Sequence, residues 1–157
     1  MAISEYLAGL RERVGHDLVL LPAVAVLIWD GEGRLLMVRE AQTNLWQTVG
    51  GAIDPDESPR DAALRETAEE VGVHIEIDAV RAVTGGPQFR LAYPNGDLVS
   101  YVSIVYDAHI VSGTPQPDGE ETLAAVWLNR AELETVALTD VAVALLSDPD
   151  VAVLSPR

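Results

Sequence analysis

Residues 51–73 read GAIDPDESPRDAALRETAEEVGV, a loop followed by a segment that carries the signals of a helix. Ser58 is a favourable N-cap, and Pro59 suits the first helical position, where a missing N–H costs nothing. Gly72 can take the left-handed conformation that commonly ends a helix. The spacing therefore predicts a helix over residues 59–71.

Three glutamates collect on one side of this predicted helix. At 3.6 residues per turn, Glu66, Glu69 and Glu70 share one face, and the opposite apolar face is expected to pack on the domain. Like charges at these spacings repel. Mg²⁺ would offset the repulsion, because it binds one or two carboxylates and shares its remaining positions with water and substrate phosphates. The three glutamates by themselves fit a magnesium site and a solvated acidic face equally well.

The residues around the glutamates complete a longer pattern. It consists of Gly51, Glu57, Arg65, Glu66, Glu69, Glu70, Gly72 and the apolar Val73. In identity and spacing this pattern resembles the Nudix box, the signature of hydrolases that cleave nucleoside diphosphates linked to another group. Thr67 stands where the family usually has an aliphatic residue, and Val49 precedes the Gly-Gly pair where proline is common. Neither departure removes an expected ligand.

The order of the remaining segments predicts an α/β fold. An amphipathic helix is expected to open the chain, and a mixed sheet is expected to carry helices against it. Strands are predicted over residues 18–29, 34–39, 46–49, 74–84, 88–93, 98–110 and 123–128, and short helices over residues 130–135 and 140–146. The resemblance implies an α/β/α sandwich with the box helix packed against the sheet. We expect a single domain over residues 1–157, with an N-terminal helical extension at 1–16 and a loosely ordered tail at 148–157.

Two hairpins are predicted from turn signals. The first joins the apolar segment 18–29 to the segment 34–39 through the turn at residues 30–33. The second joins the segments 88–93 and 98–110 through Asn95-Gly96, since this dipeptide accepts positive φ angles.

Composition excludes several classes of protein. The 157 residues include 10 basic and 25 acidic ones, a formal net charge of −15, which argues against binding to nucleic acid polymers. The chain has no cysteine and therefore no disulfide framework. The first residues lack the pattern of a signal peptide, and the apolar run over 18–29 is too short to span a bilayer. We expect a cytoplasmic protein without membrane contact.

The resemblance implies a metal-dependent enzyme that breaks a pyrophosphate bond. Glu66, Glu69 and Glu70 are expected to bind Mg²⁺ or Mn²⁺. Glu57 is expected to complete the site through a water, and Arg65 to orient a glutamate. The general base stays open between a box glutamate and an acidic residue of a later loop. The predicted catalytic set is Glu70, Glu69, Arg65, Glu57 and Glu121, with Glu120 beside it as a further candidate.

Substrate identity stays open at this point. The residues expected to contact substrate are Gly50, Gly51, Arg39, Trp46, Arg90 and Tyr93. The resemblance leaves nucleoside diphosphate sugars such as ADP-ribose, nucleoside triphosphates and dinucleoside polyphosphates as small nucleotide substrates, and a homodimer is left open. The alternative to an enzyme is a non-catalytic Nudix-like module that senses a nucleotide. Such modules tend to lose box glutamates, and this chain keeps all of them.

Overall fold

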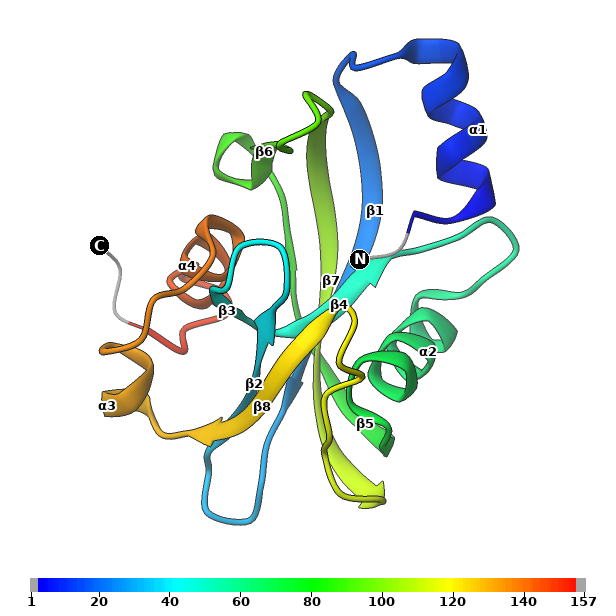
Figure 1. Ribbon diagram of the computed structural model, residues 1–157. Coiled ribbons are helices and arrows are strands. Elements are labelled where there is room, and N and C mark those ends of the chain that lie inside the picture. The colour runs from blue at the N-terminus through cyan, green and yellow to red at the C-terminus, as the bar shows by residue number, and fades with distance from the viewer. Residues whose placement is uncertain (1–2, 155–157) are drawn as a thin grey trace.

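The computed structural model describes residues 3–154 and contains two sheets (Figure 1). The larger sheet has the strand order β4-β1-β7-β5, and β6 pairs with the free part of β7. Its strands are β1 (Val19–Ile28), β4 (Val49–Ala52), β5 (His74–Thr84), β6 (Arg90–Ala92) and β7 (Leu98–Ser112). Strands β1 and β7 are parallel and the other pairs are antiparallel, so the sheet is mixed, as predicted.

The smaller sheet is antiparallel and was not predicted as a separate element. It has the order β3-β2-β8, formed by β2 (Leu35–Glu40), β3 (Trp46–Gln47) and β8 (Thr122–Leu128). The helices are α1 (Glu5–Val14), α2 (Pro59–Val71), α3 (Arg130–Leu133) and α4 (Asp140–Leu146), with a 3₁₀ turn η1 (Pro87–Phe89). Figure 1 shows α2 on one side of the sheets and α3 and α4 on the other. No helix of residues 3–154 is long and apolar enough to cross a membrane.

Strand β1 is the middle of the sandwich because its two faces supply two different cores. Leu21 and Leu27 belong to the core that contains residues of α3 and α4. Val24 and Val26 belong to the core that contains Ala62 and Val71 of α2. A strand that is apolar on both faces must be covered on both, which is why this run is continuous rather than alternating. The predicted α/β/α sandwich is confirmed.

The first predicted hairpin is wrong, and the second is confirmed. Strands β1 and β2 belong to different sheets and meet only at a bridge between Trp29 and Leu35. The doubly apolar β1 is instead paired on both edges, with β4 and with β7. The turn at Asn95-Gly96 does join two paired strands, β6 and β7, and Gly96 has a φ of 94°.

Helix α2 has the predicted bounds, but its faces differ from the prediction. Ser58 accepts a hydrogen bond from the N–H of Asp61 at 3.1 Å, and Gly72 is left-handed at φ 68° and ψ 25°. Glu66 and Glu70 are on the buried side of the helix, whereas Ala68 is exposed. The expected division into an apolar packed face and a carboxylate face is therefore wrong, because two of the carboxylates are packed inward.

The two ends of the described chain pack differently on the domain. The N-terminal helix has no buried residue, whereas the C-terminal segment contributes to the core. Helix α1 lies within the predicted extension, whose first two residues fall outside the described part. At the other end the structure differs from the expectation of a loose tail. Val151, Val153 and Leu154 are buried in the core beside α4, and the Leu154 N–H donates to the carbonyl of Leu146 at 2.7 Å. Residues 155–157 lie outside the described part.

Candidate active site

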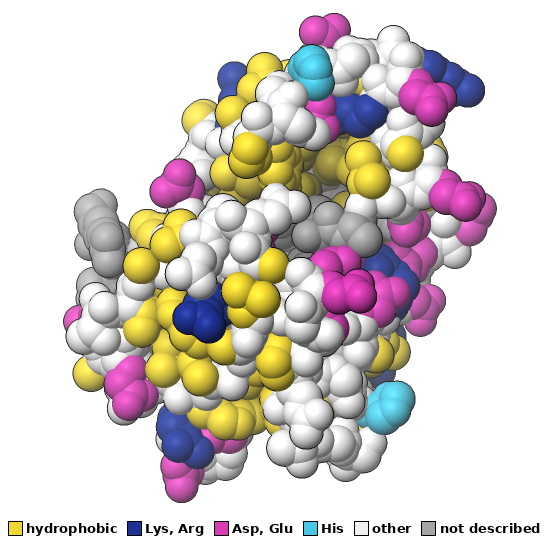
Figure 2. Space-filling view, viewed as in Figure 1, with side chains coloured by type: hydrophobic (Ala, Val, Ile, Leu, Met, Phe, Trp, Pro, Cys, Tyr) yellow, Lys and Arg dark blue, Asp and Glu magenta, His cyan; other side chains and the backbone are white. Residues whose placement is uncertain are grey.

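A cavity of about 680 Å³ opens between α1, the larger sheet and α2. Figure 2 shows the corresponding hollow, with hydrophobic side chains along its upper wall and acidic side chains gathered at its lower right edge. The residues that line the acidic end include Gly50, Gly51, Glu66, Glu70 and Glu121. The cavity is within the size range of small-molecule sites, which bury most of a ligand.

Glu66 and Glu70 are carboxylates buried without adequate compensation. Their exposed fractions are only 4% and 5%. Burial raises the pKa of Glu66 to about 7, against the opposing effect of Arg65. Burial also raises the pKa of Glu70 well above its usual range, and the neighbouring charges of Glu66 and Glu121 add to this rise. For both carboxylates, the cost of burial therefore outweighs the favourable contacts that the protein provides.

Two glycines allow this close packing of β4 against the helix. A Cβ on Gly50 would collide with the carbonyl oxygen of Val24 in β1, and a Cβ on Gly51 would collide with the Glu66 carboxylate. The backbone N–H of Gly50 donates to Glu70. The Gly50-Gly51 pair thus brings strand backbone into direct contact with the carboxylate pair.

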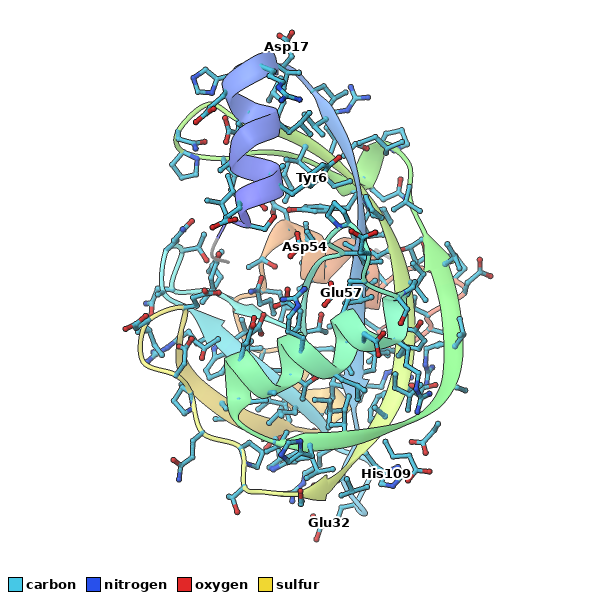
Figure 3. All side chains as sticks on the ribbon, turned by 90° about the vertical axis from the view of Figure 1, so that its right-hand side faces the viewer. Tyr6, Asp17, Glu32, Asp54, Glu57 and His109 are labelled. Atoms are coloured by element: carbon cyan, nitrogen blue, oxygen red, sulfur yellow. The ribbon has the colours of Figure 1, made fainter. Side chains whose placement is uncertain are left out.

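Arg65 connects the loop before α2 to the glutamates of the helix. Its Nε and Nη2 donate to Glu57 at 2.6 and 3.0 Å, and its Nη1 donates to Glu66 at 2.9 Å and to Glu69 at 3.2 Å. These hydrogen bonds from Arg65 lower the pKa of Glu57. Figure 3 shows Asp54 and Glu57 in the space between α1 and α2. Arg65 thus binds one oxygen of the Glu66 carboxylate, and Glu66 still lines the cavity.

The loop before β8 brings Glu121 to the same end of the cavity. Asp118 Oδ1 accepts hydrogen bonds from the N–H groups of Glu120, Glu121 and Thr122 at 2.9, 3.0 and 2.9 Å. The Thr122 hydroxyl donates to the carbonyl of Glu70 at 2.9 Å. Sequence reasoning missed Asp118 and Thr122. The available signal was an aspartate placed to bond the backbone of the residues that follow it.

The donor set fits a hard divalent cation that shares its shell with a ligand. Glu70 Oε2 is buried and has no hydrogen-bond partner. Within residues 3–154, no three side chains of His, Cys, Asp or Glu converge into a ready metal cage. Mg²⁺ does not need one, because it commonly takes one or two carboxylates and completes its shell with waters and phosphate oxygens. At this end of the cavity, Glu66 and Glu70 offer the buried carboxylates that such a cation would need.

The remaining predicted residues divide into those at the cavity and those away from it. Tyr93, like Gly50 and Gly51, lines the cavity. Arg39 lies over the ring of Trp46, 5.8 Å from its centroid, and neither residue is part of the lining. Arg90 is exposed on β6. Glu69 is 60% exposed and is turned towards Arg65 rather than the cavity. Sequence reasoning missed Tyr101 and the residues of α1 that line this space.

The fold and this site define an α/β/α sandwich whose loop–helix unit presents inward carboxylates to a ligand-sized cavity. Residues 19–146 match the family model described as the NUDIX domain, and the chain belongs to the Nudix hydrolase family. The resemblance inferred from the box is thereby confirmed.

Individual relatives agree with this assignment. A MutT-like protein from Streptomyces ambofaciens is 30% identical over 111 residues, which cover 71% of this chain and 65% of the relative. The crystal structure of a MutT NUDIX hydrolase from Burkholderia pseudomallei is similar with a TM-score of 0.66 and 25% identity, covering 79% of this chain and 93% of that one. An ADP-ribose pyrophosphatase from Streptococcus suis is similar with a TM-score of 0.58 and 26% identity, covering 79% and 87%.

Proposed function

We propose that this protein hydrolyses the pyrophosphate bond of a nucleoside diphosphate linked to another group, and that it requires Mg²⁺, for which Mn²⁺ can substitute. One observation carries the proposal. Glu70 has a buried carboxylate oxygen without a partner, beside the buried Glu66, at the end of a ligand-sized cavity. A cation bound there would satisfy both carboxylates and attract a phosphate group.

Glu66 and Glu70 hold the cation in this proposal, and Arg65 keeps Glu66 in place through the bond at 2.9 Å. A bound divalent cation supplies a polarised phosphoryl oxygen and a bound water of lowered pKa. In this proposal Glu121, which lines the same end of the cavity, accepts the proton of the attacking water. Glu70 is the alternative base, and Glu57 acts indirectly because its carboxylate is bonded to Arg65.

The names of the relatives support a nucleotide as the substrate. One structural relative is named an ADP-ribose pyrophosphatase, and ADP-ribose is a nucleoside diphosphate linked to a sugar. The competing function is a module that binds nucleotide and metal without turnover. The full set of box glutamates in this chain favours turnover.

Release of phosphate or nucleotide from a substrate panel tests the proposal. The panel contains nucleoside triphosphates, ADP-ribose, another nucleoside diphosphate sugar and a dinucleoside polyphosphate, each with Mg²⁺, Mn²⁺ or EDTA at slightly alkaline pH. We expect metal-dependent turnover of at least one compound. Binding without turnover across the panel would instead identify a nucleotide-sensing module.

Two neighbouring glutamates provide matched variants for the same assay. Glu70→Gln should lower kcat by about a thousandfold or more, since it removes a metal ligand or the base. Glu69→Gln makes the same chemical change on the exposed side of the helix and should cost much less. Equal losses of kcat in the two variants would show that Glu69 contributes to metal binding as much as Glu70 does. Near-normal turnover of Glu70→Gln would exclude its proposed role.

A further inference from the structure

Helix α1 lies outside the segment that matches the family model, yet it forms one wall of the cavity. The match begins at residue 19, whereas α1 ends at Val14. Ser4, Leu7 and Arg11 line the same cavity as the carboxylates of α2. Figure 1 shows α1 standing beside the upper part of β1, and Figure 3 shows the helix above the loop that carries Asp54 and Glu57.

The helix is attached to the domain mainly at its C-terminal end. Arg11 Nη2 donates to the carbonyl of Leu98 at 2.8 Å, and its Nη1 donates to the carbonyl of Asp17 at 2.7 Å. His16 and Asp97 share a hydrogen bond of 2.7 Å. None of the residues of α1 is fully buried. In the N-terminal half of the helix, Leu7 lines the cavity and also packs, partly buried, against the hydrophobic core.

Residues of β6 and β7, and of the turn between them, give the cavity an apolar stretch with one polar feature. Leu91 and Val99 line the cavity there together with two tyrosines, Tyr93 and Tyr101. The two hydroxyls share a hydrogen bond of 2.6 Å. Burial raises the pKa of both tyrosines, so both hydroxyls remain neutral. Because the pair uses only one of its two protons internally, the other proton can be donated to a ligand.

The charges around the cavity disfavour an additional anionic group in this region. Of the described residues that line it, the basic ones are Arg11 and Arg65, and both are engaged by carbonyls or carboxylates of the protein. The acidic lining residues are Glu40, Asp54, Glu66, Glu70, Asp97 and Glu121. A phosphate away from Glu66 and Glu70 would meet like charges and no uncommitted arginine. The region between α1 and the tyrosines is suited to an uncharged group.

We infer that the nucleobase of the substrate binds between Leu7 of α1 and the Tyr93–Tyr101 pair, and that α1 is a specificity element added to the family domain. This inference rests on the proposed function, because it places the phosphates at Glu66 and Glu70. The base contributes an apolar face to Leu7 and Leu91 and accepts a hydrogen bond from the tyrosine pair. The group beyond the pyrophosphate then leaves the cavity on the side away from α1.

Calorimetric binding tests the inference without any turnover. Nucleoside monophosphates with each of the four bases are compared with ribose 5-phosphate, which lacks a base, on the full chain with Mg²⁺. At least one nucleoside monophosphate should bind more tightly than ribose 5-phosphate. Leu7→Ala should weaken that binding about tenfold or more and leave ribose 5-phosphate unchanged. Leu10→Ala, on the same helix but outside the cavity lining, is the matched control and should change neither.

A second variant tests the hydrogen bond from the Tyr93–Tyr101 pair to the base. Tyr101→Phe keeps the ring and removes one hydroxyl, so it should change the order of preference among the four bases while ribose 5-phosphate binds as before. For the substrate found in the panel assay, Leu7→Ala should raise KM with kcat nearly unchanged, because the contact is remote from the reacting phosphorus.

Several results would overturn the inference. The first is that the wild type binds ribose 5-phosphate as tightly as any nucleoside monophosphate. The second is that Leu7→Ala and Leu10→Ala change the affinity equally. The third is that Tyr101→Phe leaves the order of preference among the bases unchanged. Base-dependent binding that is lost in Leu7→Ala, in a protein that turns over none of the panel, would retain this inference and reject the proposed hydrolysis. The two hypotheses therefore fail through different measurements.

Discussion

The hydroxyl of Thr122 donates a hydrogen bond of 2.9 Å to the backbone carbonyl of Glu70, and this bond joins the first residue of β8 to the last turn of α2. Thr122 is buried, and its N–H is held by Asp118 at 2.9 Å. The bond satisfies a carbonyl at a helix end, where no N–H of the same helix is available. It also places Glu121 at the cavity end formed by Glu66 and Glu70.

Replacing Thr122 by valine keeps the shape of the side chain and removes this hydrogen bond. We expect Thr122→Val to lower the free energy of unfolding by about 1–2 kcal/mol, since the Glu70 carbonyl loses a buried partner. It should also lower kcat about tenfold, because Glu121 is no longer held in place. Urea unfolding and steady-state kinetics measure the two effects. Thr122→Ser retains the hydroxyl and should restore most of the activity. Equal kcat values for the valine and serine variants would argue against a positioning role.

Gly51 is in contact with the Glu66 carboxylate, and any larger residue must displace that side chain. Gly51→Ala is therefore expected to raise the Mg²⁺ concentration needed for half-maximal activity by about tenfold or more. Gly31→Ala is a suitable comparison, because a Cβ at that position meets no atom within 4 Å. If titration with Mg²⁺ gave the same curve for both variants, the close contact at Gly51 would have no bearing on metal binding.

The raised pKa of Glu66 predicts a pH dependence of stability for the metal-free protein. Burial moves this pKa from 4.5 in the unfolded chain to about 7 in the folded protein. The folded state therefore holds the proton more tightly than the unfolded state. The stability from this proton is fully present below pH 4.5 and is lost as the pH rises towards 7. In EDTA, the free energy of unfolding of the wild type should fall relative to Glu66→Gln over this range. A constant difference between the two proteins would contradict the prediction.

Metal binding should show the opposite dependence on pH. The cation needs an ionised carboxylate, so protonation of Glu66 competes with binding below about pH 7. The apparent Kd for Mg²⁺ should rise by at least about tenfold for each pH unit below that value. Calorimetric titration of the wild type between pH 5.5 and pH 8 measures the slope, and an affinity that does not change with pH would refute the competition.

The C-terminal segment is predicted to contribute to stability because its apolar residues are in the core. Leu154 is 5% exposed, and the carbonyl of Val151 accepts a hydrogen bond from Arg81 at 2.8 Å. Leu154→Ala should lower the free energy of unfolding by about 2–4 kcal/mol. Val111→Ala shortens an exposed side chain on β7 and should cost far less. Urea unfolding compares the two variants, and a loss below about 0.5 kcal/mol in Leu154→Ala would support the loose tail expected from sequence.

Elements with local signals could be predicted from the sequence. Helix α2 has the bounds that its cap residues indicated, because an N-cap at Ser58 and a left-handed Gly72 act over a single turn. The β6–β7 hairpin has the same origin in Asn95-Gly96. The pairing partners of β1 could not be predicted from local signals of this kind. Its neighbours are β4 and β7 rather than β2, and that choice depends on which distant strands hydrogen-bond to its two edges.

The identity of the candidate site was likewise contained in a short stretch of sequence. Helical spacing alone places Glu66 and Glu70 on one face, and the residues around them identify the family. Tertiary packing decided what that face does. Contact with Gly50 and Gly51 buries these two carboxylates and leaves Glu69 exposed, because β4 covers only one side of the helix. Tertiary packing also brought Glu121 and the helix α1 to the same cavity, since hydrogen bonds from Thr122 and Arg11 join segments that are far apart in the chain. Spacing along one helix is a local property, whereas burial and the meeting of distant segments depend on the whole fold.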